Sequence, residues 1–127
     1  MDINLSTSDV SSIVQKAEDM ALQFTRDKLK TNQIRNFYSA ISRMRAEYEQ
    51  GGENGFEQVK NQLVMLKPKL AYSAGRQTAV RANFYPFMTS AIKSVEQAPA
   101  NMKAVAMENF FLLVESVVAY HKFHGGE

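Results

Sequence analysis

Cationic side chains gather in two stretches of this sequence that hold almost no acidic residue. Residues 58–95 contain no Asp or Glu and carry six cations, Lys60, Lys67, Lys69, Arg76, Arg81 and Lys93. Residues 26–46 carry Asp27 against six cations, Arg26, Lys28, Lys30, Arg35, Arg43 and Arg45. The charge is therefore +6 in the first stretch, +5 in the second and −9 elsewhere, which gives the net charge of +2. If the fold places both stretches on one side, that side suits a polyanion.

The segment LKPKLAYSAGR, residues 66–76, holds the sharpest local pattern. If residues 69–76 are helical, Lys69, Tyr72 and Arg76 fall at i, i+3 and i+7 on one face. The opposite face would then be apolar, at Leu66, Leu70 and Ala74. Lys offers a phosphate a point charge, Arg a two-pronged hydrogen bond, and Tyr a hydroxyl or a ring for stacking. The solvated side of an amphipathic helix would show similar spacing, but it normally mixes both charge signs. The missing acids favour a phosphate-binding face.

Other cations give weaker indications. Lys60 and Lys67, seven residues apart, flank the apolar stripe on its other edge. Arg35 lies near the start of a predicted helix, where free backbone N–H groups also attract an anion. Arg43 could instead pair with Glu47 at i+4, which would contribute about 0.3–0.5 kcal/mol. Lys30, Arg43, Lys60 and Arg81 are candidates from their charge alone. Phe84, Tyr85 and Phe87 could stack on bases, but Phe84 and Phe87 have the spacing of core residues.

Reactive groups for catalysis or metal binding do not converge in the sequence. His121 and His124 lie at i, i+3, but only the terminal Glu127 is near enough to complete a metal site. We therefore expect them to face solvent or to cap the end of a helix. There is no Cys and no phosphate-binding loop of the form G-x-x-x-x-G-K-[ST]. We predict no catalytic residue, no metal and no cofactor.

The composition predicts one soluble, cytoplasmic domain. The chain has 127 residues, 45% hydrophobic and 22% charged, which is ordinary globular composition. Its start lacks the features of a secretion signal. The longest apolar run, residues 110–120, is broken by Glu115, whereas a membrane span needs about 20 residues. We expect no membrane association.

Helical periodicity runs through almost the whole chain, and no alternating strand pattern is evident. We predict an all-α, single-domain bundle of about five helices, with loose segments at residues 1–7 and 124–127. The expected helices cover roughly residues 9–24, 31–50, 55–75, 78–97 and 100–123. Ser6 or Ser8, Thr31 and Asn54 are the expected N-caps. Pro68 should kink or restart the third helix, and Pro86 should split the fourth.

The expected core is the apolar side of each helix. Its members are Ile13, Val14, Ala17, Met20, Ala21, Phe24, Ile34, Phe37, Ile41, Met44, Tyr48, Phe56, Val59, Leu63, Leu66, Leu70, Ala74, Val80, Phe84, Phe87, Met88, Ala91, Ile92, Val95, Met102, Val105, Ala106, Phe110, Leu113, Val114 and Val117. Phe111 and Val118 lie just off the stripe of the last helix. They would either form an interface or widen the core.

Three segments together resemble the small helical subunit of type III-A CRISPR–Cas (Csm) effector complexes. They are TNQIRNF (residues 31–37), LKPKLAYSAGR (66–76) and NFFLLVESVVAYHKFHGG (109–126), so the resemblance covers about residues 31–126. The first 30 residues carry no matching motif. The resemblance implies a non-catalytic helical bundle that lines the channel of a ribonucleoprotein acting in antiviral defence against phages and plasmids.

The partners implied by the resemblance are guide RNA and target RNA, the backbone subunit and the large polymerase-like subunit. It also implies self-association by stacking, with a possible homodimer when the protein is free. The RNA-binding residues it implies are Gln33, Arg35, Lys67, Lys69, Tyr72 and Arg76.

Two other functions remain open from the sequence. One is a helical homodimeric adaptor or scaffold whose basic face binds an acidic protein partner. The other is a stand-alone DNA-binding protein, although the sequence has no helix-turn-helix pattern. A hydrolase function would in addition require turnover by the purified chain that depends on a divalent metal.

Overall fold

The computed structural model describes residues 3–126, and the regular structure within them is entirely helical. Five α-helices follow one another: α1 (Val10–Arg26), α2 (Thr31–Gln50), α3 (Gly55–Arg76), α4 (Tyr85–Glu96) and α5 (Lys103–Phe123). Short turns at Gly52–Asn54 and Ala100–Met102 lead into α3 and α5, and a π-helical segment at Val80–Phe84 leads into α4. The predicted all-α fold with about five helices is confirmed.

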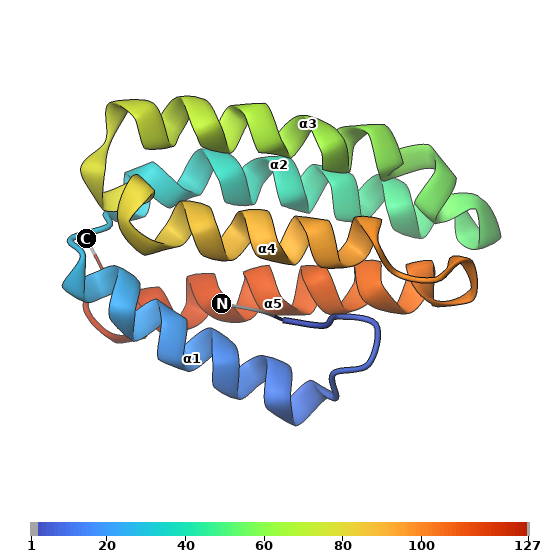
Figure 1. Ribbon diagram of the computed structural model, residues 1–127, viewed down its shortest axis with the longest axis horizontal. Helices are drawn as coiled ribbons and strands as arrows, with labels where there is room; N and C mark the ends of the chain where they lie inside the picture. Colours follow the sequence, from blue (N-terminus) through green and yellow to red (C-terminus); the bar gives the residue numbers. More distant parts are fainter. Residues whose placement is uncertain (1–2, 127) are drawn as a thin grey trace.

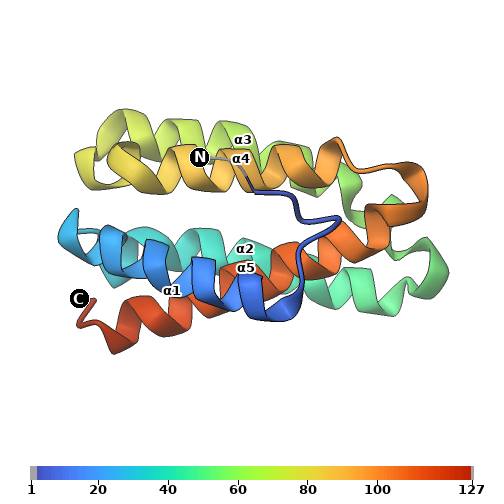
Figure 2. The ribbon, with the colours of Figure 1, turned by 60° about the horizontal axis from the view of Figure 1, so that its bottom comes forward.

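The helices form two layers. Figure 2 shows α3 and α4 side by side in one layer, with α1, α2 and α5 in the other. In Figure 1, α1 lies across α5 on the side away from α4. α5 packs against all four other α-helices, so its buried residues are distributed over several faces. This central position explains why a single inward stripe predicts α5 poorly.

The apolar stripes predicted for the first four helices are confirmed, with Val14, Tyr48 and Phe56 only partly buried. Phe84 and Phe87 are buried core residues, as their spacing predicts. In α5 the expected core position Val105 is wrong, because 44% of it is exposed. Met107 and Phe111 are buried in α5 instead, and Phe111 thus belongs to the core rather than to an interface.

Two helix starts differ from the predicted caps. α1 is capped by Asp9, not by Ser6 or Ser8, and Oδ1 of Asp9 accepts a hydrogen bond from the backbone N–H of Ser12 at 2.8 Å. Hydrogen bonding from the Ser12 side chain, and then from its backbone N–H, lowers the pKa of the Asp9 carboxyl. α2 begins at Thr31, so Lys30 takes the N-cap position and Thr31 does not cap the helix. Asn54 does occupy the N-cap position of α3, but its side chain makes no capping hydrogen bond.

The two helix prolines behave differently. α3 continues through Pro68, so the expected restart there is wrong. The fourth helical region does change geometry before its proline, with the π-helical segment Val80–Phe84 immediately before Tyr85-Pro86. Proline has no N–H and its ring crowds the carbonyl four residues earlier, so a wider turn relieves that contact.

The chain ends are held against the bundle in the part that the structure describes, contrary to the expected loose segments. The backbone N–H of Leu5 donates to Oγ of Ser94 at 2.7 Å, and Nδ2 of Asn109 donates to the carbonyl of Leu5 at 2.7 Å. Leu5 is fully buried. The expected loose residues 1, 2 and 127 lie outside the described residues.

His121 is buried, so the expectation that it faces solvent is wrong. Its Nε2 lies 2.7 Å from the carbonyl oxygen of Leu29. A carbonyl only accepts hydrogen bonds, so Nε2 carries the proton and donates. The N–H of Gly126 donates in turn to the carbonyl of His121 at 2.8 Å. His121 therefore joins the end of α5 to the connection between α1 and α2.

Tyr48 links α2 to α5 and gives a pH-dependent prediction. Its hydroxyl donates to Oε2 of Glu108 at 2.8 Å, and its ring packs edge-to-face on Phe111 with centroids 5.5 Å apart. Burial, and then the Glu108 carboxylate, raise the pKa of Tyr48 to about 12. The folded pKa exceeds the unfolded value of about 10, so this contact stabilises the fold fully below about pH 10 and is lost as the pH rises through 12. In an ultraviolet titration, Tyr48→Phe should remove the component near pH 12; the same component surviving in that variant would contradict the assignment.

Candidate nucleic-acid interface

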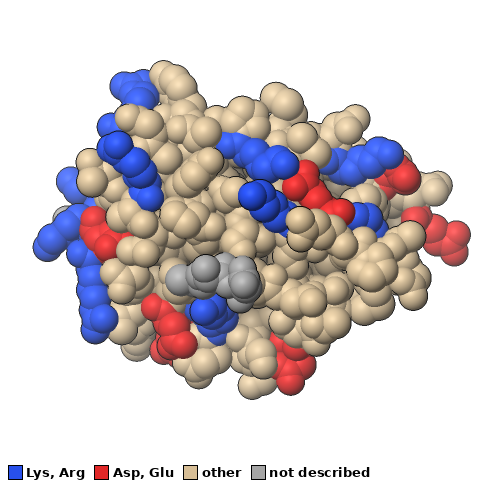
Figure 3. All heavy atoms as spheres, viewed as in Figure 1, with Lys and Arg blue, Asp and Glu red and all other residues tan. Residues whose placement is uncertain are grey.

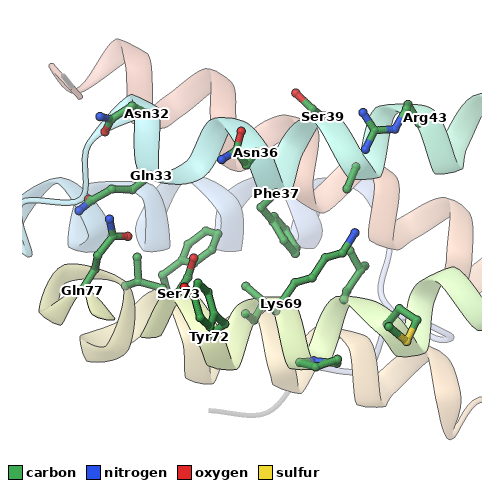
Figure 4. Close-up of a pocket in the computed structure, with 17 residues that line it drawn as sticks. Asn32, Gln33, Asn36, Phe37, Ser39, Arg43, Lys69, Tyr72, Ser73 and Gln77 are labelled. Atoms are coloured by element: carbon green, nitrogen blue, oxygen red, sulfur yellow. The ribbon is translucent and has the colours of Figure 1, made fainter. Parts of the chain in front are cut away.

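A groove runs between α2 and α3 on the surface of the bundle. Its floor is apolar and includes Phe37, Leu66 and Phe84, and its rim is made of polar side chains from both helices. A second hollow continues it along the same helices past Met44 and Asn61. Figure 4 shows the polar side chains of α2 on one side of this groove and those of α3 on the other. The lining of both parts contains no Asp or Glu.

Four of the sequence-predicted site residues line this groove. They are Gln33 and Arg43 from α2, and Lys69 and Tyr72 from α3. Figure 4 shows Lys69 extending from α3 towards α2. Arg76 adjoins the groove through Tyr72, because its Nη1 donates to the Tyr72 hydroxyl at 2.9 Å and its guanidinium lies 5.5 Å from the ring centroid. The fold thus brings the cations of two segments together at one groove.

Arg43 does not make the ion pair that its spacing suggests. Among residues 3–126 it forms neither a hydrogen bond nor an ion pair, and it is exposed at the groove. Its neighbour Arg45 pairs with acids instead, with Glu115 at 2.5 Å and Glu49 at 3.7 Å. The charge of Arg43 is therefore not neutralised by any side chain within residues 3–126.

Two predicted lysines lie outside the groove and already have partners. Nζ of Lys67 lies 3.0 Å from Oε1 of Glu96 on α4, and Nζ of Lys60 lies 2.5 Å from Oε2 of Glu57. The Lys67 pair joins α3 to α4 and is partly buried, so removing either partner would leave a poorly solvated charge. These two lysines are weaker candidates for an anion than the groove cations.

The remaining predicted cations are exposed. Lys30 and Arg81 lie at the end of the bundle where α3 ends and α2 begins, and Arg35 lies on the first turns of α2. Arg26, Lys28 and Arg76 lie at the same end. In Figure 3, Lys and Arg gather at this end, on the left, with some acidic atoms among them. The groove reaches this basic end through Asn32 and Gln77.

Sequence reasoning missed the uncharged half of the site. The side-chain amides of Asn32, Asn36 and Gln77 and the hydroxyls of Ser39 and Ser73 all line the groove. Asn32 and Asn36 are at i, i+4, as are Ser39 and Arg43, so one polar face of α2 could have been recognised from spacing alone. Gln77 follows the end of α3, and only the fold brings it near α2.

Within residues 3–126, no group of three or more His, Asp or Glu side chains is placed to hold a metal ion. None of the helices in this part of the chain is long and apolar enough to cross a membrane.

Comparison with known proteins identifies the family. The family model described as Csm2 Type III-A matches residues 7–127. The chain belongs to the Csm2 family. This confirms the resemblance to the small subunit of type III-A CRISPR–Cas effector complexes and extends it towards the N-terminus, because the match begins at residue 7.

A curated Csm2 relative covers nearly the same length. The CRISPR system Cms protein Csm2 of Streptococcus thermophilus is 28% identical over 120 residues, which is 90% of this chain and 92% of the relative. No solved structure matches the chain. The α2–α3 groove and every predicted site residue lie within the part that matches the Csm2 family.

Proposed function

We propose that this Csm2 chain is a non-catalytic subunit that binds the RNA backbone in a type III-A CRISPR effector complex, through the α2–α3 groove and the adjoining basic end. The single observation that carries the proposal is a groove with Lys69, Arg43 and Tyr72 in its lining and no carboxylate. An anion entering it meets positive charge from two helices and no repulsion from acids.

The candidate residues separate into three groups by their surroundings. Lys69, Tyr72, Arg76, Arg43 and Gln33 are at the groove and would contact the RNA first. Arg35, Lys30 and Arg81 are exposed and would extend the contact along the strand. Lys67 and Lys60 would have to leave an ion pair to take part, so we expect them to contribute least.

The family suggests that other Csm subunits and further copies of this chain are its protein partners. One copy offers few free cations, so its own affinity for RNA would be modest, and several copies along one strand would add avidity. In this arrangement the guide and target RNA pair with each other, and this chain holds the backbone.

Replacing two groove cations tests the proposal. Lys69→Ala with Arg76→Ala should weaken binding of single-stranded RNA roughly tenfold at about 0.1 M salt, to a similar extent for different sequences. The slope of log affinity against log salt should fall by about 1.4, because each lost phosphate contact removes about 0.7 for a single strand. Fluorescence anisotropy at several salt concentrations measures both quantities.

The matched control is Lys16→Ala with Lys93→Ala, which removes the same charge from α1 and α4, outside the groove. It should change the salt slope little, and helical circular dichroism should be the same for all three proteins. An unchanged slope in the Lys69/Arg76 variant, or an equal loss in the control, would refute binding at this groove.

The adaptor function is favoured by one observation of its own. Val64 and Met65 on α3 are exposed, at 44% and 55%, beside the basic groove, and an acidic partner with an apolar patch could cover them. Purification of the complex from native expression separates the two functions. Bound guide RNA with other Csm subunits supports the RNA-binding proposal, whereas a single acidic protein without RNA supports the adaptor.

A further inference from the structure

We propose that the α2–α3 groove holds an unpaired nucleobase of the bound RNA strand, stacked on Tyr72 and hydrogen bonded by side-chain amides. This inference rests on the proposed RNA binding and specifies which part of the RNA enters the groove. The phosphates on either side of that base would meet Lys69, Arg43 and Arg76.

The side-chain amides are the first observation that points to a base. Four of them line one groove: Asn32, Gln33, Asn36 and Gln77 (Figure 4). Among the described residues, the side chains of Asn32, Asn36 and Gln77 make no hydrogen bond, and Gln33 uses only its Oε1, which accepts from the N–H of Lys30 at 2.8 Å. A phosphate only accepts hydrogen bonds, so donors alone would suit it. An amide both donates and accepts, which is what the edge of a nucleobase requires.

The shape of the groove is the second observation. Its floor is apolar, with Phe37, Val80 and Phe84 all at least nine-tenths buried, while its rim carries the amides, the hydroxyls and the cations. A nucleobase has the same division, with apolar faces and polar edges. A phosphate has no apolar face and would gain nothing from such a floor. A base also provides the aromatic surface that Tyr72 can stack against.

Tyr72 is exposed and yet held in place. Its exposure is 67%, large for an aromatic ring that lines a groove. The hydrogen bond from Arg76 to its hydroxyl and the guanidinium beside its ring restrict how the ring can turn. A ring restrained in advance loses less entropy when a base stacks on it. Tyr72 and Arg76 together therefore place a stacking surface for a base next to a cation for the adjoining phosphate.

The groove should tolerate different bases. An amide can present its donor or its acceptor by rotating about the terminal torsion, so four amides can satisfy more than one base edge. Stacking is equally available to every base. This suits a subunit that must accept any guide or target sequence.

The test compares two single strands that differ only in their bases. One is an oligouridine of about 12 nucleotides, and the other is the same ribose-phosphate chain with abasic residues throughout. The full chain should bind the oligouridine about five- to tenfold more tightly than the abasic strand, the lower part of the range for stacking one base on an aromatic side chain. Tyr72→Ala should remove most of that difference, because it should weaken binding of the oligouridine more than binding of the abasic strand.

Two further variants make the result specific. Asn36→Ala with Gln77→Ala should also weaken oligouridine binding more than abasic-strand binding, because it removes amides and no charge. Phe123→Ala removes an aromatic ring that is 76% exposed and lies outside the groove, and it should change neither affinity.

Each adverse outcome identifies a different failure. If the wild-type chain binds neither strand, the proposed RNA binding fails and this inference fails with it. If the wild-type chain binds both strands equally, RNA binding survives and the base site is wrong. If Tyr72→Ala weakens both strands equally, the ring serves only to position Arg76, which also overturns the inference. If Tyr72→Ala leaves RNA binding intact but prevents another subunit from co-purifying, the groove is a protein interface.

Discussion

Phe84→Ala is expected to lower the free energy of unfolding by about 3–5 kcal/mol, the range for truncating a buried aromatic residue. Phe84 is 1% exposed and packs edge-to-face on two rings from other helices. Its centroid lies 5.2 Å from that of Phe24 in α1 and 5.6 Å from that of Phe37 in α2. Truncation would leave a cavity among three elements and also remove part of the groove floor.

Urea unfolding followed by circular dichroism at 222 nm would measure this loss. Phe84→Leu should retain most of the packing volume and fold even if Phe84→Ala does not, with a smaller loss than the alanine variant. Phe123→Ala, at an exposed aromatic, should stay within about 0.5 kcal/mol of wild type. A Phe84→Ala protein as stable as Phe123→Ala would show that Phe84 is not part of the core.

The fold was largely predictable because four helices bury one face each. A residue repeated at i, i+3 and i+4 identifies such a face without knowledge of the neighbours, and Leu63, Leu66 and Leu70 in α3 illustrate it. α5 could not be predicted as well, because it is surrounded. Phe111 lies off its expected stripe and is buried by neighbouring segments that periodicity in α5 does not reveal. His121 continues the stripe at i+4 from Val117, but periodicity does not reveal its hydrogen-bond partner, the carbonyl of Leu29.

The cations of the groove were predictable, and their partners were not. Lys69 and Tyr72 share a helix face that spacing alone identifies. The pair between Lys67 and Glu96 joins residues 29 apart in the sequence, so only the packing of α3 on α4 shows that Lys67 is occupied. Gln77 could not be predicted as a site residue for the same reason. It lies across the groove from the amides of α2, and only the packing of the helices shows this.

Arg43 shows that a local rule can mislead. Its spacing to Glu47 permits an ion pair, but such exposed pairs contribute so little that tertiary surroundings decide whether they form. In the fold, Arg43 lies at the groove with Lys69 nearby in the lining, and Arg45 takes the acidic partners. The unpaired state of Arg43 strengthens its candidacy for RNA.

Gly55→Ala should be strongly destabilising, although Gly55 has ordinary helical angles, φ −54° and ψ −46°. A Cβ at this position would lie 2.3 Å from the backbone carbonyl oxygen of Tyr48 and 3.1 Å from its ring carbon Cδ1. A backbone oxygen in the last turns of α2 cannot move aside as a side chain can. We expect a loss of about 2–3 kcal/mol, because α2 and α3 must separate where they turn back on each other.

Gly75→Ala is the matched control on the same helix. A Cβ there meets no atom within 4 Å, so the substitution adds no contact and should stabilise the protein by about 0.5 kcal/mol through the lower entropy of the unfolded chain. Urea unfolding of both variants would give the difference. Because α2 and α3 are the two walls of the groove, Gly55→Ala should also weaken RNA binding, whereas Gly75→Ala should not. Equal stability of the two variants would mean that the close contact between Gly55 and Tyr48 does not hold these walls together.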